Sequence, residues 1–239
     1  MKKFLIALLI GLMCVPMLAF ASSDLHLDKA PDRSGNHAAL QRGAKTFVNY
    51  CLNCHSASYM RYNRLTDIGL SDAQIKDNLL FTADKVGELM KVGLQRADGR
   101  VFFGAAPPDL TVIARARGSE AGSGADWLYT YLRGFYRDSE RPTGWNNTVF
   151  PNVGMPHVFW ELQGDQVLGE NHALELASPG KLSAAEYDAM VGDLVGYLNY
   201  MGEPGADARK RLGVFVLLGL LLLFILTYAL KREYWKDVH

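Results

Sequence analysis

The five residues Cys51-Leu52-Asn53-Cys54-His55 constrain this chain more than any other stretch. They read Cys-x-x-Cys-His, the spacing that attaches a c-type haem, because two thiols so placed can bond the two haem vinyl groups. The imidazole that follows can then bind the iron. A thioredoxin-type redox pair would follow a strand, and a cysteine-only zinc site would need a second pair. The run before Cys51 has a helical pattern and no cysteine follows Cys54, so covalent haem is favoured.

The start of the chain predicts export. Residues 1–21 combine two lysines, a long apolar run and an Ala-Phe-Ala sequence, which together read as a cleavable signal peptide. A lipoprotein signal ending at Cys14 is the alternative, but Gly-Leu-Met before that cysteine is a poor match. Export agrees with covalent haem, which bacteria attach outside the cytoplasmic membrane.

A second apolar run predicts a membrane anchor. Residues 212–230 carry no charge, and as a helix they would span ~28 Å, close to the ~30 Å hydrocarbon core of a bilayer. We expect a periplasmic haem domain at 22–205, a basic linker at 206–211 and a cytoplasmic tail at 231–239. Basic residues flank the anchor equally on both sides, so the orientation follows from the signal peptide and not from the positive-inside rule. The predicted location is the bacterial cytoplasmic (inner) membrane, crossed once.

Charge is distributed unevenly along the chain, although the formal net charge is zero. Residues 22–205 hold 17 Lys and Arg against 22 Asp and Glu, whereas basic residues gather near the anchor. An anionic head argues against a nucleic-acid partner and for a cationic protein partner or simple solubility.

The pattern of apolar residues predicts an all-α fold, an elaborated cytochrome c-type haem domain with one C-terminal transmembrane helix. The helix before the haem motif and the last helix of the head would cross over the haem. The head is longer than one haem needs, so the additional chain is expected to serve a partner. Helices are predicted at 38–50, from Ser71, from Thr82, at 125–137 and from Ser183, with irregular chain at 99–108, 141–156 and 157–180.

The second axial ligand decides whether the iron is closed to small molecules. Met155 lies in the stiff loop 151–156, where Gly154 allows close approach to the haem and Pro156 needs no amide partner. A thioether ligand favours ferrous iron and raises the reduction potential. His157 is the main alternative. The remaining candidates are Met60, Met90, Met190, Met201, His26, His37, His172 and His239.

Further motifs follow one another in a recognisable order. They are Arg61-Tyr62, Gly-Ala-Ala-Pro-Pro-Asp-Leu at 104–110, Ala-Arg-Ala-Arg at 114–117, Asp126, Phe150-Pro151 before Gly154-Met155, Arg-Lys-Arg-Leu-Gly at 209–213, and Lys231-Arg232 before Trp235. In this order they resemble the cytochrome c1 family, the haem subunits of ubiquinol–cytochrome c reductases. The resemblance covers nearly all of the mature chain.

The resemblance implies one covalently attached haem c and a role for particular residues. Cys51 and Cys54 would form the thioethers, His55 and Met155 would be the axial iron ligands, Pro107 would pack beside the haem, and Arg117 would reach a haem propionate. The family often has tyrosine after the aspartate that opens the aromatic helix, but this chain has Trp127. Indole donates one hydrogen bond and accepts none, so a propionate contact at Trp127 is not carried over.

The resemblance also implies a function and partners. A Rieske iron–sulfur protein would deliver single electrons, cytochrome c would collect them, and cytochrome b would complete a dimeric, quinol-oxidising complex. The chain itself would catalyse no reaction that makes or breaks covalent bonds. One alternative is a tethered c-type module of another complex, such as a terminal oxidase. Others are a haem sensor or peroxidase, which needs an open sixth site, and an anchor protein without haem.

An acidic stretch after Met155 is a candidate docking site. Between Arg141 and Lys181 the sequence has no basic residue other than histidine, and four carboxylates lie there: Glu161, Asp165, Glu170 and Glu175. We expect them to steer a cationic cytochrome c, with a solvated loop as the alternative.

Overall fold

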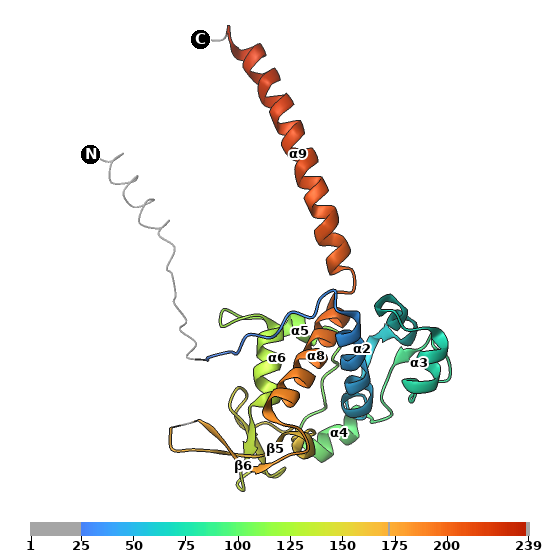
Figure 1. Cartoon of the computed structure of the whole chain (residues 1–239), viewed down its shortest axis with the longest axis vertical. Coiled ribbons are helices and arrows are strands. Elements are labelled where there is room, and N and C mark those ends of the chain that lie inside the picture. The colour runs from blue at the N-terminus through green and yellow to red at the C-terminus, as the bar shows by residue number, and fades with distance from the viewer. Residues whose placement is uncertain (1–24, 172, 238–239) are drawn as a thin grey trace, which may run out of the picture.

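The computed structural model describes residues 25–171 and 173–237, so the predicted signal peptide, Cys14 and His239 lie outside the described residues (Figure 1). The helices are α2 (His37–Thr46), η1 (Phe47–Cys51), η2 (Tyr62–Ile68), α3 (Asp72–Asn78), α4 (Arg96–Phe103), α5 (Ile113–Ala116), α6 (Gly124–Arg133), α7 (Trp160–Gln163), α8 (Ala184–Gly202) and α9 (Ala206–Trp235). The strands are β1 (Ala57–Arg61), β2 (Leu89–Met90), β3 (Phe135–Arg137), β4 (Trp145–Asn147), β5 (Gly164–Leu168) and β6 (Leu174–Pro179).

Helix starts are the best-predicted local features. Ser71, Ser123 and Ser183 each accept a hydrogen bond from the backbone three residues on, and a side chain there returns one. These capping boxes satisfy amide groups that have no partner within the helix. The predicted helices from Ser71 and Ser183 are therefore confirmed, as is the helix before the haem motif.

The centre of the head is the crossing of α2 and α8. Gly43 makes this crossing possible, because a Cβ there would lie 2.1 Å from the backbone oxygen of Asp193 and 2.7 Å from Cβ of Tyr197. Phe47 and Tyr197 pack with ring centroids 5.6 Å apart, and both are fully buried. The predicted crossing of the first and last helices of the head is thus present, with α6 packed on the other side of α8 (Figure 1).

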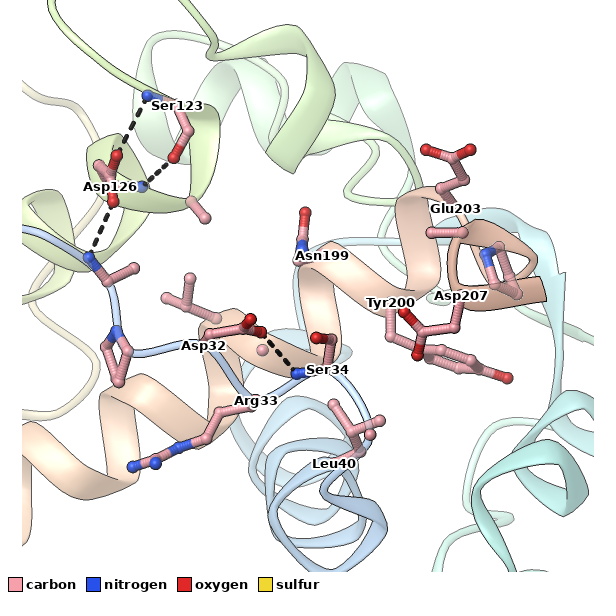
Figure 2. A pocket seen from close by; sticks show the side chains of 18 of the residues that line it. Asp32, Arg33, Ser34, Leu40, Ser123, Asp126, Asn199, Tyr200, Glu203 and Asp207 are labelled. Carbon is pink, nitrogen blue, oxygen red and sulfur yellow. Dashed lines mark hydrogen bonds between the residues drawn. The ribbon is translucent and has the colours of Figure 1, made fainter. Parts of the chain in front are cut away.

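The N-terminal segment, residues 25–36, ties these helices together. Asp126 at the start of α6 accepts hydrogen bonds from the Ala30 amide and the Lys29 ammonium, at 2.8 and 3.0 Å. Burial alone would raise the pKa of Asp126. These hydrogen bonds and those from Ser123 have the larger effect, so the pKa is lowered overall and the carboxyl stays ionised. Figure 2 shows Asp126, Asp32 and Asn199 around a small pocket of about 250 Å³ beneath this segment.

Three two-stranded antiparallel sheets were not predicted, namely β1–β2, β3–β4 and β5–β6. The expected helix from Thr82 is wrong, because Leu89–Met90 form strand β2, and the preceding backbone pairs with Tyr62 and Asn63. Met90 is fully buried there instead of lying on a helix face. The stretch 157–180 is likewise not irregular, since α7 and the β5–β6 hairpin occupy it. The predicted all-α class is confirmed for the helical core and the C-terminal helix, to which the three small sheets are additions.

Two helix boundaries also differ from the sequence prediction. Helix α4 runs into the predicted loop 99–108 and ends at Gly104, whose φ of 76° favours glycine. Helix α6 ends at Arg133, and the chain continues as strand β3, because Gly134 allows the close approach of Thr148. The first end is therefore set by a local glycine cap, whereas the second depends on a contact with Thr148 in a later segment.

Helix α9 extends away from the head with its side chains exposed (Figure 1). Its apolar part is long enough to cross a membrane, and it is the one such helix among the described residues. The residues at 206–211 and 231–235 belong to the same helix, so the basic linker is helical.

Candidate haem site

The haem motif follows directly from α2. The π-helical turn η1 carries the chain to Cys51, whose carbonyl accepts hydrogen bonds from the amides of Cys54 at 3.1 Å and His55 at 2.8 Å. This tight turn brings both thiols and the imidazole to one cavity. Cys51 and Cys54 are not joined in a disulfide, so both sulfurs are available for thioether bonds.

The cavity has a volume of about 340 Å³, within the usual range of ligand pockets of roughly 300–1,000 Å³. Its lining comes from the haem motif, the loop after α4, helices α6 and α8, and the loop before α7. Most of the lining is apolar, including Ile113, Leu128, Leu132, Val153, Leu194 and Leu198. A cavity with such walls suits a mostly apolar group.

His55 is held with one ring nitrogen available. Its Nδ1 lies 2.8 Å from the carbonyl oxygen of Pro108. Since a carbonyl only accepts, Nδ1 carries the proton and Nε2 keeps its lone pair. Burial lowers the pKa of His55, although the Pro108 carbonyl and Asp109 oppose the shift. The neutral imidazole that an iron ligand requires is therefore favoured.

The Pro-Pro-Asp-Leu loop is fastened to the strand after the haem motif. The Leu110 amide donates to the Ser56 carbonyl at 2.8 Å, and Asp109 accepts from the Ser58 amide at 2.7 Å. Burial raises the pKa of Asp109, but hydrogen bonds from Thr111 and Ser58 lower it overall. Pro107 lines the cavity and packs against Gly99, where a Cβ would lie 2.7 Å from the proline ring. The loop therefore fixes both Pro107 and the carbonyl that orients His55.

Met155 lines the same cavity from the loop before α7. The hydroxyl of Tyr131 donates to its sulfur at 3.3 Å. Gly154 allows the loop to approach α4, since a Cβ there would lie 2.7 Å from the backbone oxygen of Phe103. Arg141 and Asn146 each bond Asn152, which has a positive φ of 63°. The stiffness expected of this loop thus has a structural basis.

The alternative ligands among the described residues do not line this cavity, and His172, like His239, lies outside the described residues. His157 is 2% exposed, stacked on Phe135 at 4.8 Å and against the edge of Trp145 at 4.9 Å. Burial lowers the pKa of His157 to about 4. In the part of the chain that the structure describes, Met155 is the one methionine that lines the cavity. Met60, Met90 and Met201 are buried in the core.

Arg117 supplies a positive charge at the cavity. Its guanidinium carbon lies 4.5 Å from the ring centroid of Trp127 and 5.6 Å from that of Phe150. Between residues 25 and 237, leaving out residue 172, no carboxylate pairs with Arg117, so the guanidinium can meet an anionic group. Trp127 contributes its ring face here, and it also stacks on Tyr131 at 4.8 Å.

The predicted acidic residues do not form a single patch of free carboxylates. Glu161 pairs with Lys181, and Asp165 pairs with Arg137 at 3.0 Å. Glu170 and Glu175 lie on or beside the β5–β6 hairpin and are exposed.

The cavity thus gathers two thiols, an imidazole with a nitrogen lone pair, a thioether and the Arg117 guanidinium around apolar walls. This donor set fits a covalently attached haem. Sequence reasoning missed two supporting groups, the Pro108 carbonyl and the Tyr131 hydroxyl. Tyr131 could have been noticed, because it lies one helical turn after Trp127.

Comparison with known proteins decides the family. The sequence profile of the Cytochrome C1 family matches residues 29–88 and 95–238. The chain belongs to the cytochrome c1 family. Proteins of this family carry covalently attached haem c and are haem subunits of cytochrome bc1 complexes. The chain is accordingly a membrane-anchored c-type cytochrome of a respiratory chain, with cytochrome b and a Rieske protein as subunit partners.

Individual relatives are similar to the chain in sequence along its whole length. Cytochrome c1 of Allochromatium vinosum is 45% identical over 251 residues and covers 100% of both chains. A Nitrosomonas europaea protein named ammonia monooxygenase gamma subunit is 48% identical over 242 residues, covering 100% of this chain and 99% of its own. A solved chain of a hyperthermophilic respiratory Complex III matches with 15% identity and a TM-score of 0.43, covering 100% of this chain and 98% of its own.

Proposed function

We propose that this cytochrome c1 passes single electrons from the Rieske protein to a soluble or tethered cytochrome c through one closed haem site. Cys51 and Cys54 would hold the haem by thioethers, and His55 and Met155 would bind its iron. The observation that carries this assignment is that both thiols, the free nitrogen of His55 and the sulfur of Met155 line one cavity.

Other residues of the cavity have separate proposed roles toward the haem. The haem, when bound, supplies the one-electron couple. The Pro108 carbonyl orients His55, and Pro107 lines the cavity where it would pack against the haem. The Met155 thioether would favour the ferrous state, and Arg117 would pair with a propionate. The Arg117 role would be wrong if an Arg117→Gln variant kept the parent's reduction potential.

We further propose that the haem domain is periplasmic and that residues 231–239 are cytoplasmic, as the export signal requires. The basic residues at the start of α9 would then lie at the periplasmic surface of the cytoplasmic membrane. A dimeric parent complex is proposed from the family alone.

The complex is tested by purification. When a tagged full chain is purified from native membranes, cytochrome b and the Rieske protein are expected to co-purify with it. Quinol is expected to reduce the haem of this preparation. A chain that lacks residues 206–239 should retain haem but lose quinol-dependent reduction completely. A preparation that contains monooxygenase subunits, as the name of the Nitrosomonas relative suggests for that protein, or a terminal oxidase would contradict the proposal.

The acceptor surface is proposed at the rim of the cavity beside α7 and along the β5–β6 hairpin. Tyr50 lines the cavity and packs on Phe159 at 5.0 Å, which places α7 near the rim. Glu161 and Asp165 are paired with Lys181 and Arg137. The exposed Glu170 and Glu175 therefore supply most of the uncompensated negative charge of this surface.

Reversing the charge of Glu170 and Glu175 to lysine is expected to slow reduction of a cationic cytochrome c several-fold at low ionic strength. The reason is the loss of electrostatic steering, so added salt should remove the difference. Stopped-flow reduction across a salt series measures this. An Asp77→Lys/Asp84→Lys variant changes the net charge by the same amount at exposed positions away from the hairpin, and it is the matched control. Equal rates for all three proteins at low salt would exclude the hairpin as a docking site.

A further inference from the structure

The hydroxyl of Tyr131 is buried against the proposed distal ligand. It donates a hydrogen bond to the Met155 sulfur at 3.3 Å, and the tyrosine is 8% exposed. This sulfur is the hydroxyl's hydrogen-bond partner among the described residues.

The ring of Tyr131 is held on several sides, so the hydroxyl cannot easily turn away. It stacks on Trp127 with an interplanar angle of 13°, and Phe135 meets it edge-on at 5.1 Å. The Asn147 side chain donates to the Tyr131 carbonyl at 2.8 Å. Asn147 is itself 1% exposed and caps the backbone of the loop that leads to Met155. The donor and the loop that carries its acceptor are therefore held by the same residue.

A hydrogen bond to a thioether sulfur changes what that sulfur gives to iron. The donor draws electron density from the sulfur lone pairs, so the sulfur stabilises electron-poor ferric iron less. Ferrous iron depends less on this donation. A donor on the ligand sulfur therefore raises the reduction potential and weakens the bond of the ligand in the ferric state.

We propose that Tyr131 is a positioning residue that raises the reduction potential of the haem by donating its hydroxyl to Met155. This inference rests on the proposed function, because it requires Met155 to be the distal ligand. Tyr131 makes no bond to iron and acts only through the sulfur.

The test compares Tyr131→Phe with Tyr129→Phe in the full-length haem protein. Tyr129 is a matched control because it lies on the same helix and is 9% exposed, but its ring lies under the Arg133 guanidinium at 4.5 Å. Redox titration should show that Tyr131→Phe shifts the electron equilibrium toward ferric haem by about three- to tenfold, which is about 30–60 mV for one electron. Tyr129→Phe should leave the potential unchanged.

Spectroscopy separates this inference from the assignment on which it rests. The far-red charge-transfer band of ferric haem reports methionine sulfur on iron, and we expect it in the parent and in both variants. Exogenous ligands such as imidazole should displace Met155 from ferric Tyr131→Phe less readily than from the parent. A retained band with no shift in potential would overturn the role of Tyr131 alone. A parent protein without the band would overturn both this role and the Met155 assignment.

Discussion

Replacing Met155 with leucine is expected to open the sixth iron position and to lower the reduction potential by more than about 60 mV, a tenfold change in a one-electron equilibrium. Leucine keeps most of the volume but has no sulfur to bind iron, so the ferrous state loses its preferred ligand. The reduced variant should bind carbon monoxide at neutral pH, whereas the parent should not. The rate of quinol-dependent cytochrome c reduction should fall by at least as much as this equilibrium changes, which is about tenfold.

The matched control is Met190→Leu, because Met190 packs against the core from α8 without lining the haem cavity. It should keep the potential of the parent and exclude carbon monoxide. Carbon monoxide binding by the parent itself would favour a sensor or peroxidase over an electron relay. An unchanged potential in Met155→Leu would remove Met155 as the ligand, and His157 would still be a poor replacement, because it is stacked on Phe135 and Trp145.

The residues of the proposed site can be recognised from the sequence where local chemistry marks them. Cys51, Cys54 and His55 stand out by their spacing, and the stiff loop around Met155 stands out by its glycine and prolines. The Tyr131 hydroxyl was not predictable as a donor to Met155, because the two residues meet only after α6 packs against a loop 24 residues away. The same limit applies to the Pro108 carbonyl, which lies 53 residues from His55.

The fold divides in the same way. Capping boxes specify helix starts locally, so the helices from Ser71 and Ser183 were predicted correctly. Strand β2 has only two residues, and its pairing with β1 joins segments about 30 residues apart. No local pattern can specify such a pairing, and the helical spacing of Val86, Leu89 and Met90 was misleading. The acidic stretch was correct in composition, but the Arg137 and Lys181 partners of two carboxylates come from flanking segments.

Substituting Gly43 with alanine is expected to reduce stability strongly, because the crossing of α2 and α8 leaves no room for a side chain. The added Cβ would lie 2.1 Å from the Asp193 oxygen and 2.7 Å from Tyr197. Both atoms belong to the rigid part of a buried helix, so α8 would have to move. Forced overpacking of this kind costs about 1–3 kcal/mol, and backbone contact at such short distance should place Gly43→Ala at or above the upper end.

The damage should also reach the haem, because α2 leads directly into η1 and Cys51. A shift of α8 would disturb Asp193, which is 5% exposed and pairs with Arg33 and Arg42 at 2.9 and 2.7 Å. Denaturant unfolding of the full-length haem protein, followed by haem absorbance and circular dichroism, measures the loss. Gly87→Ala is the matched control, since a Cβ added at Gly87 would have no neighbour within 4 Å, and its effect should stay within about 0.5 kcal/mol. Equal unfolding midpoints for the two variants would mean that the α2–α8 contact can relax, and the haem motif would then not depend on the helix crossing for its position.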